Sequence, residues 1–246
     1  MKVMLTGGLG FMGSALAHRL LKEKHDLTII DKLTYAGSLD NMLPYRWRDQ
    51  SLNLFRWKQE DVADYFTIDK LFKQYKPDVC YHLAAESAVD KSIENSSDFV
   101  TSNVVGTHSI LEACKNNNVP LVYQDTDEVF GAHKRDSIGQ WTEESPIQPR
   151  NPYSASKAGA LCLVQSYIKT YKMSIKIARS CNVYGPRQAF DKLIPRSIRF
   201  ALQGKPIEIY PDGFQTREWI FVEDYVDAFL YIATYGKNGE SYNIST

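Results

Sequence analysis

Cysteine is scarce in this sequence, an excess of either charge is absent, and no apolar run approaches the ~18 residues of a membrane span. The four cysteines form no Cys-x-x-Cys pair and no metal-ligand spacing, so we expect neither a disulfide framework nor a metal site. Cys80 and Cys162 stand among apolar residues, and we expect both to be buried. A net charge of zero disfavours nucleic acid as a partner. With no signal-peptide pattern, the simplest expectation is a cytoplasmic protein without membrane association.

Strand-like and helix-like segments alternate along most of the chain. Short apolar runs predict strands, and apolar residues at helical spacing predict helices. Strands that are apolar on both faces are typical of a parallel sheet with helices on both sides. We therefore expect an α/β fold with a doubly wound parallel sheet, the Rossmann arrangement. Strands are expected at 2–5, 27–30, 53–57, 79–83, 121–123 and 174–178, and helices at 11–21, 64–75 (Phe66, Leu71 and Phe72 inward), 99–115 and 153–171.

The pattern changes after about residue 182, where Gly, Pro and charged residues become frequent between the elements. Helices are expected at 193–202 and 222–235, and strands at 207–210 and 242–245. We interpret residues 1–181 as the main domain and residues 182–246 as a smaller lobe built on its sheet.

Three glycines, Gly7, Gly10 and Gly13, lie between the first expected strand and the first helix. Gly7 permits a tight turn, Gly10 lets the backbone approach a diphosphate at the helix N-terminus, and Gly13 lets helix and strand pack closely. Asp31 ends the next strand, where a carboxylate accepts from the adenosine ribose and repels a 2′-phosphate. The pattern predicts NAD rather than NADP, although Lys32 beside Asp31 weakens that preference. The alternatives are ordinary turn glycines and an aspartate that only closes a strand.

Tyr153 and Lys157 stand four residues apart at the start of a long expected helix, so both lie on one face. A tyrosine that acts as a base at neutral pH needs its pKa lowered by ~3 units, which a neighbouring ammonium and an oxidised nicotinamide can supply. Thr126 lies at the end of an extended strand. Its hydroxyl can hold the substrate oxygen whose proton the tyrosine would take. Such Tyr/Lys pairs are common on helices, and the glycine turn and Thr126 make this one specific.

These residues together give the chain a resemblance to the extended short-chain dehydrogenases and, among them, to the dTDP-glucose 4,6-dehydratases. The resemblance covers essentially the whole chain. The segments that carry it are Thr-Gly-Gly-Leu-Gly-Phe-Met-Gly at 6–13, Asp-Lys-Leu-Thr-Tyr-Ala-Gly at 31–37, His-Leu-Ala-Ala-Glu-Ser at 82–87, Thr-Asp-Glu at 126–128, Tyr-Ser-Ala-Ser-Lys at 153–157, Asn182, Lys-Leu-Ile-Pro at 192–195, and Arg217.

The resemblance implies a role for each of these residues. Glu128 would remove the C5 proton of a nucleotide-linked 4-keto glucose, and Asp127 would protonate the departing C6 hydroxyl. Repulsion between two adjacent carboxylates separates their pKa values, so one can stay protonated as the acid while the other is ionised as the base. The alternative interpretation of this pair is a solvated acidic turn. The implied NAD-binding residues are Gly7, Gly10, Phe11, Met12, Gly13, Asp31, Lys32, Thr34, Asp61, Val62, Leu83, Ala84, Ala85, Ser102, Tyr153, Lys157 and Val183, and the implied substrate-binding residues are Ser87, Thr126, Asn182, Lys192, Leu193 and Arg217.

Three features depart from the family pattern. Ala88 stands where the family commonly has His, so a contact to the sugar is expected to be lost. Asp125 replaces the usual Ser and adds a third carboxylate, which could raise a neighbour's pKa. The sequence ends at Thr246, where family members usually continue for several tens of residues, so we expect an incomplete substrate lobe.

Two other functions stay open at this stage. A 4-epimerase or uronate decarboxylase shares the glycine turn, Thr126, Tyr153 and Lys157, but needs no Asp127–Glu128 pair. A non-catalytic NAD-binding protein is the alternative from another class. The resemblance also implies a homodimer that pairs the helices expected at 99–115 and 153–171, because the second has more apolar residues than one sheet-facing stripe needs.

Overall fold

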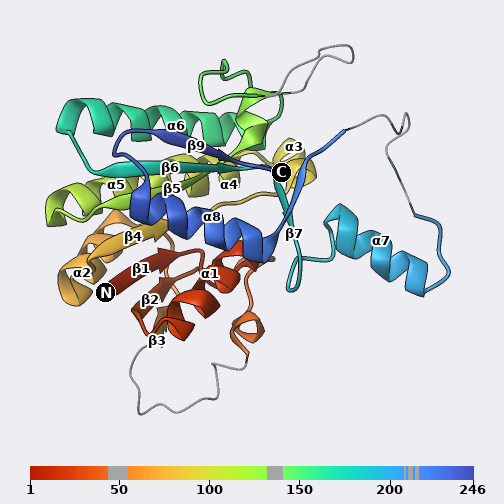
Figure 1. Ribbon diagram of the computed structural model, residues 1–246, viewed down its shortest axis with the longest axis horizontal. Helices are drawn as coiled ribbons and strands as arrows, with labels where there is room; N and C mark the ends of the chain where they lie inside the picture. Colours follow the sequence, from red (N-terminus) through yellow and green to blue (C-terminus); the bar gives the residue numbers. More distant parts are fainter. Residues whose placement is uncertain (44–54, 132–140, 208, 210–212, 214–215) are drawn as a thin grey trace.

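A central parallel sheet is covered on both faces by helices (Figure 1). The computed structural model describes residues 1–43, 55–131, 141–207, 209, 213 and 216–246. The sheet contains β1 (Lys2–Thr6), β2 (Asp26–Ile30), β3 (Phe55–Lys58), β4 (Val79–His82), β5 (Leu121–Thr126), β6 (Ile175–Ser180) and β9 (Ser241–Ile244), in the order β3-β2-β1-β4-β5-β6-β9 with every pairing parallel. The predicted doubly wound α/β fold is confirmed.

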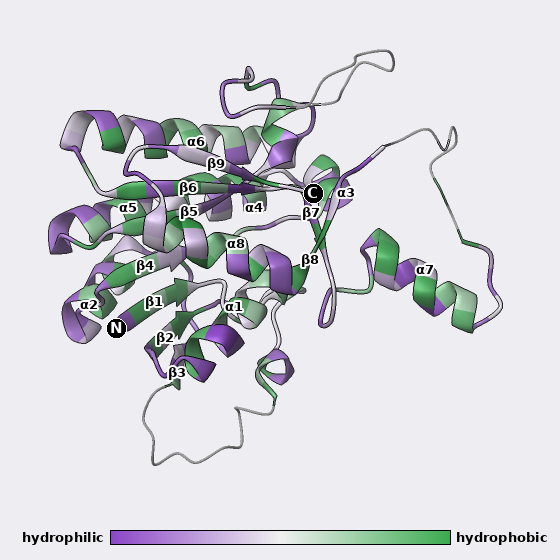
Figure 2. Ribbon diagram, in the orientation of Figure 1, coloured by the Kyte–Doolittle hydropathy of each residue, from purple (hydrophilic) through white to green (hydrophobic). Residues whose placement is uncertain are grey.

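Two apolar cores lie on opposite faces of this sheet. Leu5, Val122 and Ala178 face α1 (Phe11–Lys22) and α8 (Val222–Tyr235). Leu121 and Ile177 face α2 (Tyr65–Tyr75), α5 (Gly106–Asn117) and α6 (Pro152–Tyr171). These strands therefore pack apolar side chains on both faces, and Figure 2 shows β1, β2 and β4 as largely green among helices of mixed colour.

Side-chain caps fix where two of the helices begin. The Asp64 carboxylate accepts from the Thr67 N–H at 3.2 Å, so α2 begins one residue after the predicted start. Asn151 and Ser154 form a reciprocal capping box, with Pro152 in the first turn of α6. This cap sets the position of Tyr153, the second residue of the helix.

Some sequence predictions were wrong. Phe66 is 83% exposed, because the inward stripe of α2 runs through Ile68, Leu71 and Phe72. Cys162 is exposed, since it lies beside the sheet-facing stripe of α6. The helix predicted at 99–115 is divided into α4 (Ser97–Phe99), a π-helical segment η4 (Val100–Val105) and α5. A π segment has no clear sequence signature, and such segments occur often at functional sites.

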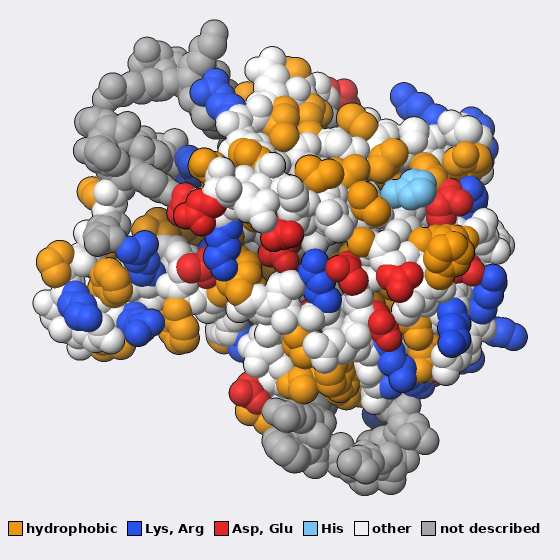
Figure 3. All heavy atoms as spheres, turned by 180° about the vertical axis from the view of Figure 1, so that it is seen from behind, with side chains coloured by type: hydrophobic (Ala, Val, Ile, Leu, Met, Phe, Trp, Pro, Cys, Tyr) orange, Lys and Arg blue, Asp and Glu red, His pale blue; other side chains and the backbone are white. Residues whose placement is uncertain are grey.

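The C-terminal part of the chain divides between the main sheet and a projection. Strand β9 pairs with β6, and α8 packs into the core beside α1, so both belong to the main body. Strands β7 (Asn182–Tyr184) and β8 (Trp219–Phe221) form a separate two-stranded sheet. Helix α7 (Leu193–Leu202) has no buried residue and projects from the body, with apolar and basic side chains on its visible face (Figure 3). The separate lobe at 182–246 stays a prediction, and the strand expected at 207–210 includes residues outside the described ones.

The remaining short elements lie at the carboxyl edge of the sheet. They are η1 (Leu39–Met42), α3 (Val89–Glu94) and η5 (Asp127–Phe130). Among the described residues, no helix is both long and apolar enough to cross a membrane, and no group of three or more His, Cys, Asp or Glu side chains could hold a metal ion.

Candidate active site

The carboxyl ends of β1, β2, β4, β5 and β6 border a cavity of about 580 Å³. The strand order reverses between β1 and β4, and open parallel sheets bind their ligands at such a switch point. Residues from α3, α6 and the start of α7 complete its walls. Elements far apart in the sequence therefore meet at one end of the sheet.

The glycine turn forms a cradle that fits a dinucleotide. Gly7 has φ +69°, and a Cβ on Gly13 would lie 2.0 Å from the Gly7 carbonyl oxygen, so neither position accepts a side chain without strain. Gly10 is the N-cap of α1, and a Cβ there would meet only the Gly7 oxygen at 3.4 Å. The first turn of α1, from Gly10 to Gly13, thus lines the cavity, and a helix N-terminus favours a diphosphate.

Asp31 lies at the adenosine end of the cradle. Its carboxylate accepts from the Leu9 N–H and the Leu33 N–H, each at 2.9 Å, and it lines the cavity. Burial raises the pKa of this carboxyl, and the two N–H donors oppose that shift. Lys32 turns away from it, donating to Ser102 at 2.7 Å and lying 3.4 Å from Asp61. Asp31 therefore both closes the strand and presents a carboxylate to the cavity, so the two interpretations of its sequence position are compatible.

A buried amide that the sequence analysis missed connects the loop after β4 to α6. Asn103, in the π segment, accepts from the Glu86 N–H at 2.9 Å and donates to the Glu86 carbonyl at 3.0 Å. It also donates to the Ser156 hydroxyl at 2.8 Å. These bonds fix the cavity loop against the helix that carries Tyr153 and Lys157.

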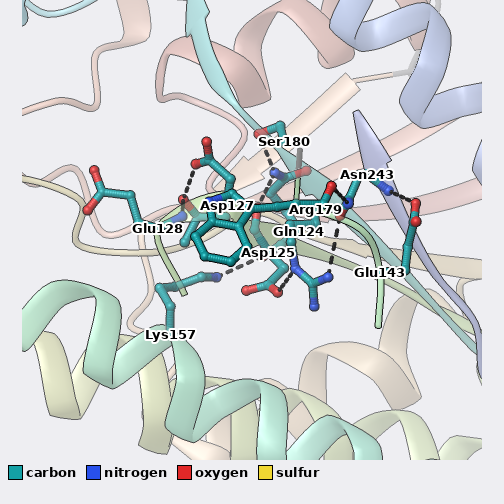
Figure 4. Close-up of polar contacts among 11 residues, drawn as sticks. Gln124, Asp125, Asp127, Glu128, Glu143, Lys157, Arg179, Ser180 and Asn243 are labelled. Atoms are coloured by element: carbon teal, nitrogen blue, oxygen red, sulfur yellow. Dashed lines mark hydrogen bonds and ion pairs between the residues drawn. The ribbon is translucent and has the colours of Figure 1, made fainter. Parts of the chain in front are cut away.

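The segment Thr126–Glu128 turns from the end of β5 into η5. The Thr126 hydroxyl accepts from the Glu128 N–H at 3.3 Å and lies 3.4 Å from the Asp127 carboxylate. Asn151, the cap of α6, donates to the Glu128 carboxylate at 3.2 Å. Both carboxylates line the cavity, from one short turn (Figure 4).

The two carboxyls are held in different surroundings. Burial and then the charge of Glu128 raise the pKa of Asp127 to about 6, while Thr126 and Arg217 act against the shift. A carboxyl with a pKa of about 6 is half protonated near pH 6 and still about one-tenth protonated at pH 7. Asp127 thus has the property expected of a general acid, beside a second carboxylate suited to the role of base.

Tyr153 and Lys157 both reach the cavity from α6. Burial and the charge of Glu128 raise the pKa of Tyr153, and a hydrogen bond with Thr126 opposes this. Burial lowers the pKa of Lys157 to about 8. The prediction that Lys157 and an oxidised nicotinamide together lower the tyrosine pKa stays a prediction, because burial and the nearby carboxylates raise that pKa among the protein groups alone. The ammonium donates instead to the Gln124 carbonyl at 2.7 Å.

Most of the residues singled out in the sequence line this single cavity. Asp61 and Arg217 do not. Asp61 accepts from the Ala63 N–H at 2.9 Å, and exposed Arg217 donates to the neighbouring Thr216 carbonyl at 2.8 Å. The roles of all these residues stay predictions. Cavity residues that the sequence analysis did not select for a site include Glu60, Glu86, Gln124, Ser180, Cys181, Asp191 and Arg196.

Comparison with known proteins agrees with this geometry. The family model "NAD dependent epimerase/dehydratase family" matches residues 3–245. The dTDP-glucose 4,6-dehydratase of Haemophilus influenzae is 42% identical over 256 residues, 99% of this chain and 74% of that protein. The enzyme of the same name from Neisseria gonorrhoeae is 40% identical over 254 residues, 98% of this chain and 72% of that protein.

The chain belongs to the NAD-dependent epimerase/dehydratase family.

Solved structures of similar proteins show the same fold. A dTDP-glucose 4,6-dehydratase from Streptomyces venezuelae, solved with NAD bound, has a TM-score of 0.93 at 35% identity, covering 99% of this chain and 75% of that one. A UDP-glucuronic acid 4-epimerase from Bacillus cereus was solved in complex with UDP-glucuronic acid and NAD. It has a TM-score of 0.89 at 31% identity, and the match covers 100% of this chain and 77% of that one. Family membership and the glycine cradle together make NAD the cofactor of this site.

Proposed function

We propose that this family member is an NAD-dependent nucleoside-diphosphate-glucose 4,6-dehydratase, with the dTDP sugar as its first candidate substrate. The observation that supports this proposal most is the Asp127–Glu128 pair, placed in one cavity with Thr126, Tyr153 and Lys157. Oxidation and reduction at C4 alone need only the last three. An acid and a base beside them are what elimination of water across C5 and C6 requires.

Each side chain has a distinct part in this chemistry. Tyr153 takes the proton of the C4 hydroxyl, while Thr126 holds the same oxygen. NAD, when bound, accepts the C4 hydride and later returns it at C6. Glu128, oriented by Asn151, removes the C5 proton that the 4-ketone has acidified. Asp127 gives its proton to the departing C6 hydroxyl, in keeping with its raised pKa of about 6.

The substrate class follows from the opposite wall of the cavity. Lys192 lines it, donates to the Ser87 carbonyl at 3.2 Å, and has its pKa lowered by burial. Asn182 and Leu193 lie beside it, and Arg217 is near enough to influence Asp127. A lysine in the wall of the cavity and an arginine close enough to influence Asp127 suit a diphosphate. A nucleotide sugar is also what the Bacillus cereus neighbour binds.

We also infer a homodimer and a cytoplasmic location. Exposed apolar side chains lie along η4 and α6, including Val100 (49% exposed), Val105 (44%) and Tyr171 (51%). Pairing with a second copy would cover them. The described cysteines are all free, as expected in a reducing compartment. Sedimentation at micromolar concentration would show a monomer if the dimer is wrong.

The experiment for the dehydratase follows the C5 hydrogen. The protein is incubated with NAD and dTDP- or UDP-glucose in deuterated water, and the product is analysed by NMR. A 4-keto-6-deoxy sugar with deuterium at C5 is the expected result. A C4 epimer without deuterium at C5 would instead assign the site to a 4-epimerase and remove elimination from the roles of Asp127 and Glu128.

A further inference from the structure

Three side chains from neighbouring strands form a row under the catalytic turn. Asp125 on β5 stands opposite Arg179 on β6, which stands opposite Asn243 on β9. The Arg179 Nε donates to the Asp125 Oδ2 at 2.8 Å, and its Nη1 lies 3.4 Å from the Asn243 Oδ1 (Figure 4). Arg179 also lies over the Phe130 ring, 4.6 Å from its centroid. The row thus joins the strand before the catalytic residues to the last strand of the sheet.

This ion pair has almost no access to solvent. Asp125 is 1% exposed and Arg179 is 2% exposed. Burying an ion pair this deeply costs desolvation free energy, unless further hydrogen bonds or opposite charges compensate for it. Within the described part of the chain, the second carboxylate oxygen, Oδ1, has no hydrogen-bond partner. Arg179 alone therefore does not account for the whole carboxylate.

A second buried cation lies near the same carboxylate. Lys157 is 5% exposed, and attraction between it and Asp125 opposes the burial that otherwise moves the pKa of each group. The charge of Asp125 raises the pKa of Lys157 and so opposes the effect of burial on its ammonium. The groups around Lys157 and the carboxylates of the turn are the Gln124 carbonyl and Tyr123 ring on β5, Tyr153 on α6, neutral His82 on β4, Arg179 on β6, and Asp127 and Glu128 on η5.

We propose that Asp125 is a positioning residue that serves as shared counter-ion to Arg179 and Lys157, so that it keeps the active-site lysine protonated while fixing β5 to β6 and β9. The proposal rests on the proposed function only for its effect on turnover. Asp125 needs no contact with substrate or cofactor for this role. It acts through Lys157 on one side and through the row Arg179–Asn243 on the other.

The far end of the row reaches a surface loop. The Asn243 N–H donates to the Glu143 carboxylate at 2.7 Å, and its amide donates to the Trp141 carbonyl at 3.2 Å. Trp141 stacks on Phe130 with centroids 5.5 Å apart, beside Arg179. The ion pair is therefore enclosed by the loop as well as by the strands, which excludes water from the underside of the catalytic turn.

The test measures the proton of Lys157 without relying on turnover. The NAD-free protein is labelled with a trace of acetic anhydride over a pH series, and acetylation of Lys157 is followed by peptide mass spectrometry. Exposed Lys24 serves as internal standard. In the wild type the midpoint for Lys157 is expected near the pKa of about 8. In Asp125→Asn it should fall by about 1 to 3 units, the usual influence of a close opposite charge.

Two further variants separate the role toward Lys157 from the role toward Arg179. Arg179→Gln keeps the carboxylate, so its Lys157 midpoint should not fall. The double variant Asp125→Asn/Arg179→Gln removes both members of the buried ion pair, so Arg179 is not left without its carboxylate and the protein should fold even if Asp125→Asn alone does not, yet its Lys157 midpoint should stay low. A midpoint unchanged in Asp125→Asn, or returned to the wild-type value in the double variant, would overturn the proposal.

Turnover then gives an independent result. With Asp125→Asn, the alkaline limb of C4 oxidation should move to lower pH by the same interval as the Lys157 midpoint. A shifted midpoint in a protein that never dehydrates a nucleotide glucose would support the role of Asp125 and contradict the proposed function. The two proposals can therefore fail separately.

Discussion

The two sides of the cavity differ in how firmly the protein holds its side chains. On the catalytic side, Lys157 is 5% exposed and Asp125 1% exposed, and both belong to elements packed into the main sheet. On the substrate side, α7 contains no buried residue, and Arg217 is exposed, with a hydrogen bond to the neighbouring Thr216 carbonyl. The catalytic groups are thus preorganised by the core, whereas Arg217, one of the groups expected to bind the diphosphate, owes little to packing.

This difference has a physical origin. Parallel strands end together, so side chains at the ends of β5 and β6 meet without help from a ligand. Electrostatic catalysis depends on such fixed positions, because nothing has to reorganise during the reaction. An exposed charged side chain is screened by solvent and not held in one position, so it contributes little binding free energy until a ligand orders it. Substitutions on the catalytic side should therefore change rates greatly, and those on the substrate side should change them little.

The largest effect is expected at the two bases. Tyr153→Phe should lower turnover by about 10²–10⁴-fold, with no reduced NAD formed, because the C4 proton has no acceptor. Glu128→Gln should lower product formation by a similar factor while reduced NAD still accumulates, because only elimination is blocked. Absorbance of reduced NAD in single turnovers distinguishes the two. NAD affinity measured by titration should be unchanged in Glu128→Gln; a loss of affinity would mean that Glu128 shapes the cofactor cradle.

Asp127→Asn should lower the activity of the protein and raise its stability. The variant lacks the acid, so product formation should fall by about 10²-fold or more. The wild-type rate of elimination should itself decline above pH 6, as Asp127 loses its proton.

The stability effect of this substitution has the opposite sign. Because the folded-state pKa of about 6 exceeds the ordinary value of 3.8, protonated Asp127 stabilises the fold fully below about pH 4, and that contribution is lost as the pH rises through 6. At pH 7 the variant should therefore be more stable than the wild type, by at most about 3 kcal/mol. Thermal unfolding at several pH values measures this. A variant less stable than the wild type at pH 7 would show that Asp127 is held by an attraction stronger than its burial.

The same contrast separates what the sequence could predict from what it could not. The glycine turn, Asp31 and the segment after β5 have local patterns, and their strands and helices follow from apolar periodicity. Asn103, Asn151 and Arg179 were missed because their partners are distant in sequence: only the register of β5 with β6 brings Asp125 opposite Arg179. The π segment and the exposure of Phe66 and Cys162 depend on packing that periodicity does not resolve.

Asp31→Asn should have an intermediate effect on the cofactor. Asparagine keeps the shape but removes the charge that the ribose hydroxyls would meet, so NAD affinity should fall by about 10-fold, as for one charge-assisted hydrogen bond. NADP affinity should fall less or rise, since the repulsion of its 2′-phosphate is removed. The matched control is Asp224→Asn, because exposed Asp224 on α8 does not line the cavity and its substitution should leave the ratio unchanged. Fluorescence titration with both dinucleotides measures it. An unaltered ratio in Asp31→Asn would reduce Asp31 to its role in closing the strand.

The smallest effect is expected at Arg217, and it tests the comparison most directly. Exposed charges typically contribute under about 1 kcal/mol, so Arg217→Ala should raise KM for the nucleotide sugar by less than about fivefold and leave kcat nearly unchanged. Lys192→Ala is the matched variant on the same side, and it should raise KM more, because this lysine lines the cavity and is partly desolvated. Steady-state kinetics at saturating NAD measures both. If Arg217→Ala instead raises KM by more than Lys192→Ala, the segment that carries Arg217 must close over the substrate. The substrate side would then be ordered by its ligand, not loosely held throughout the reaction.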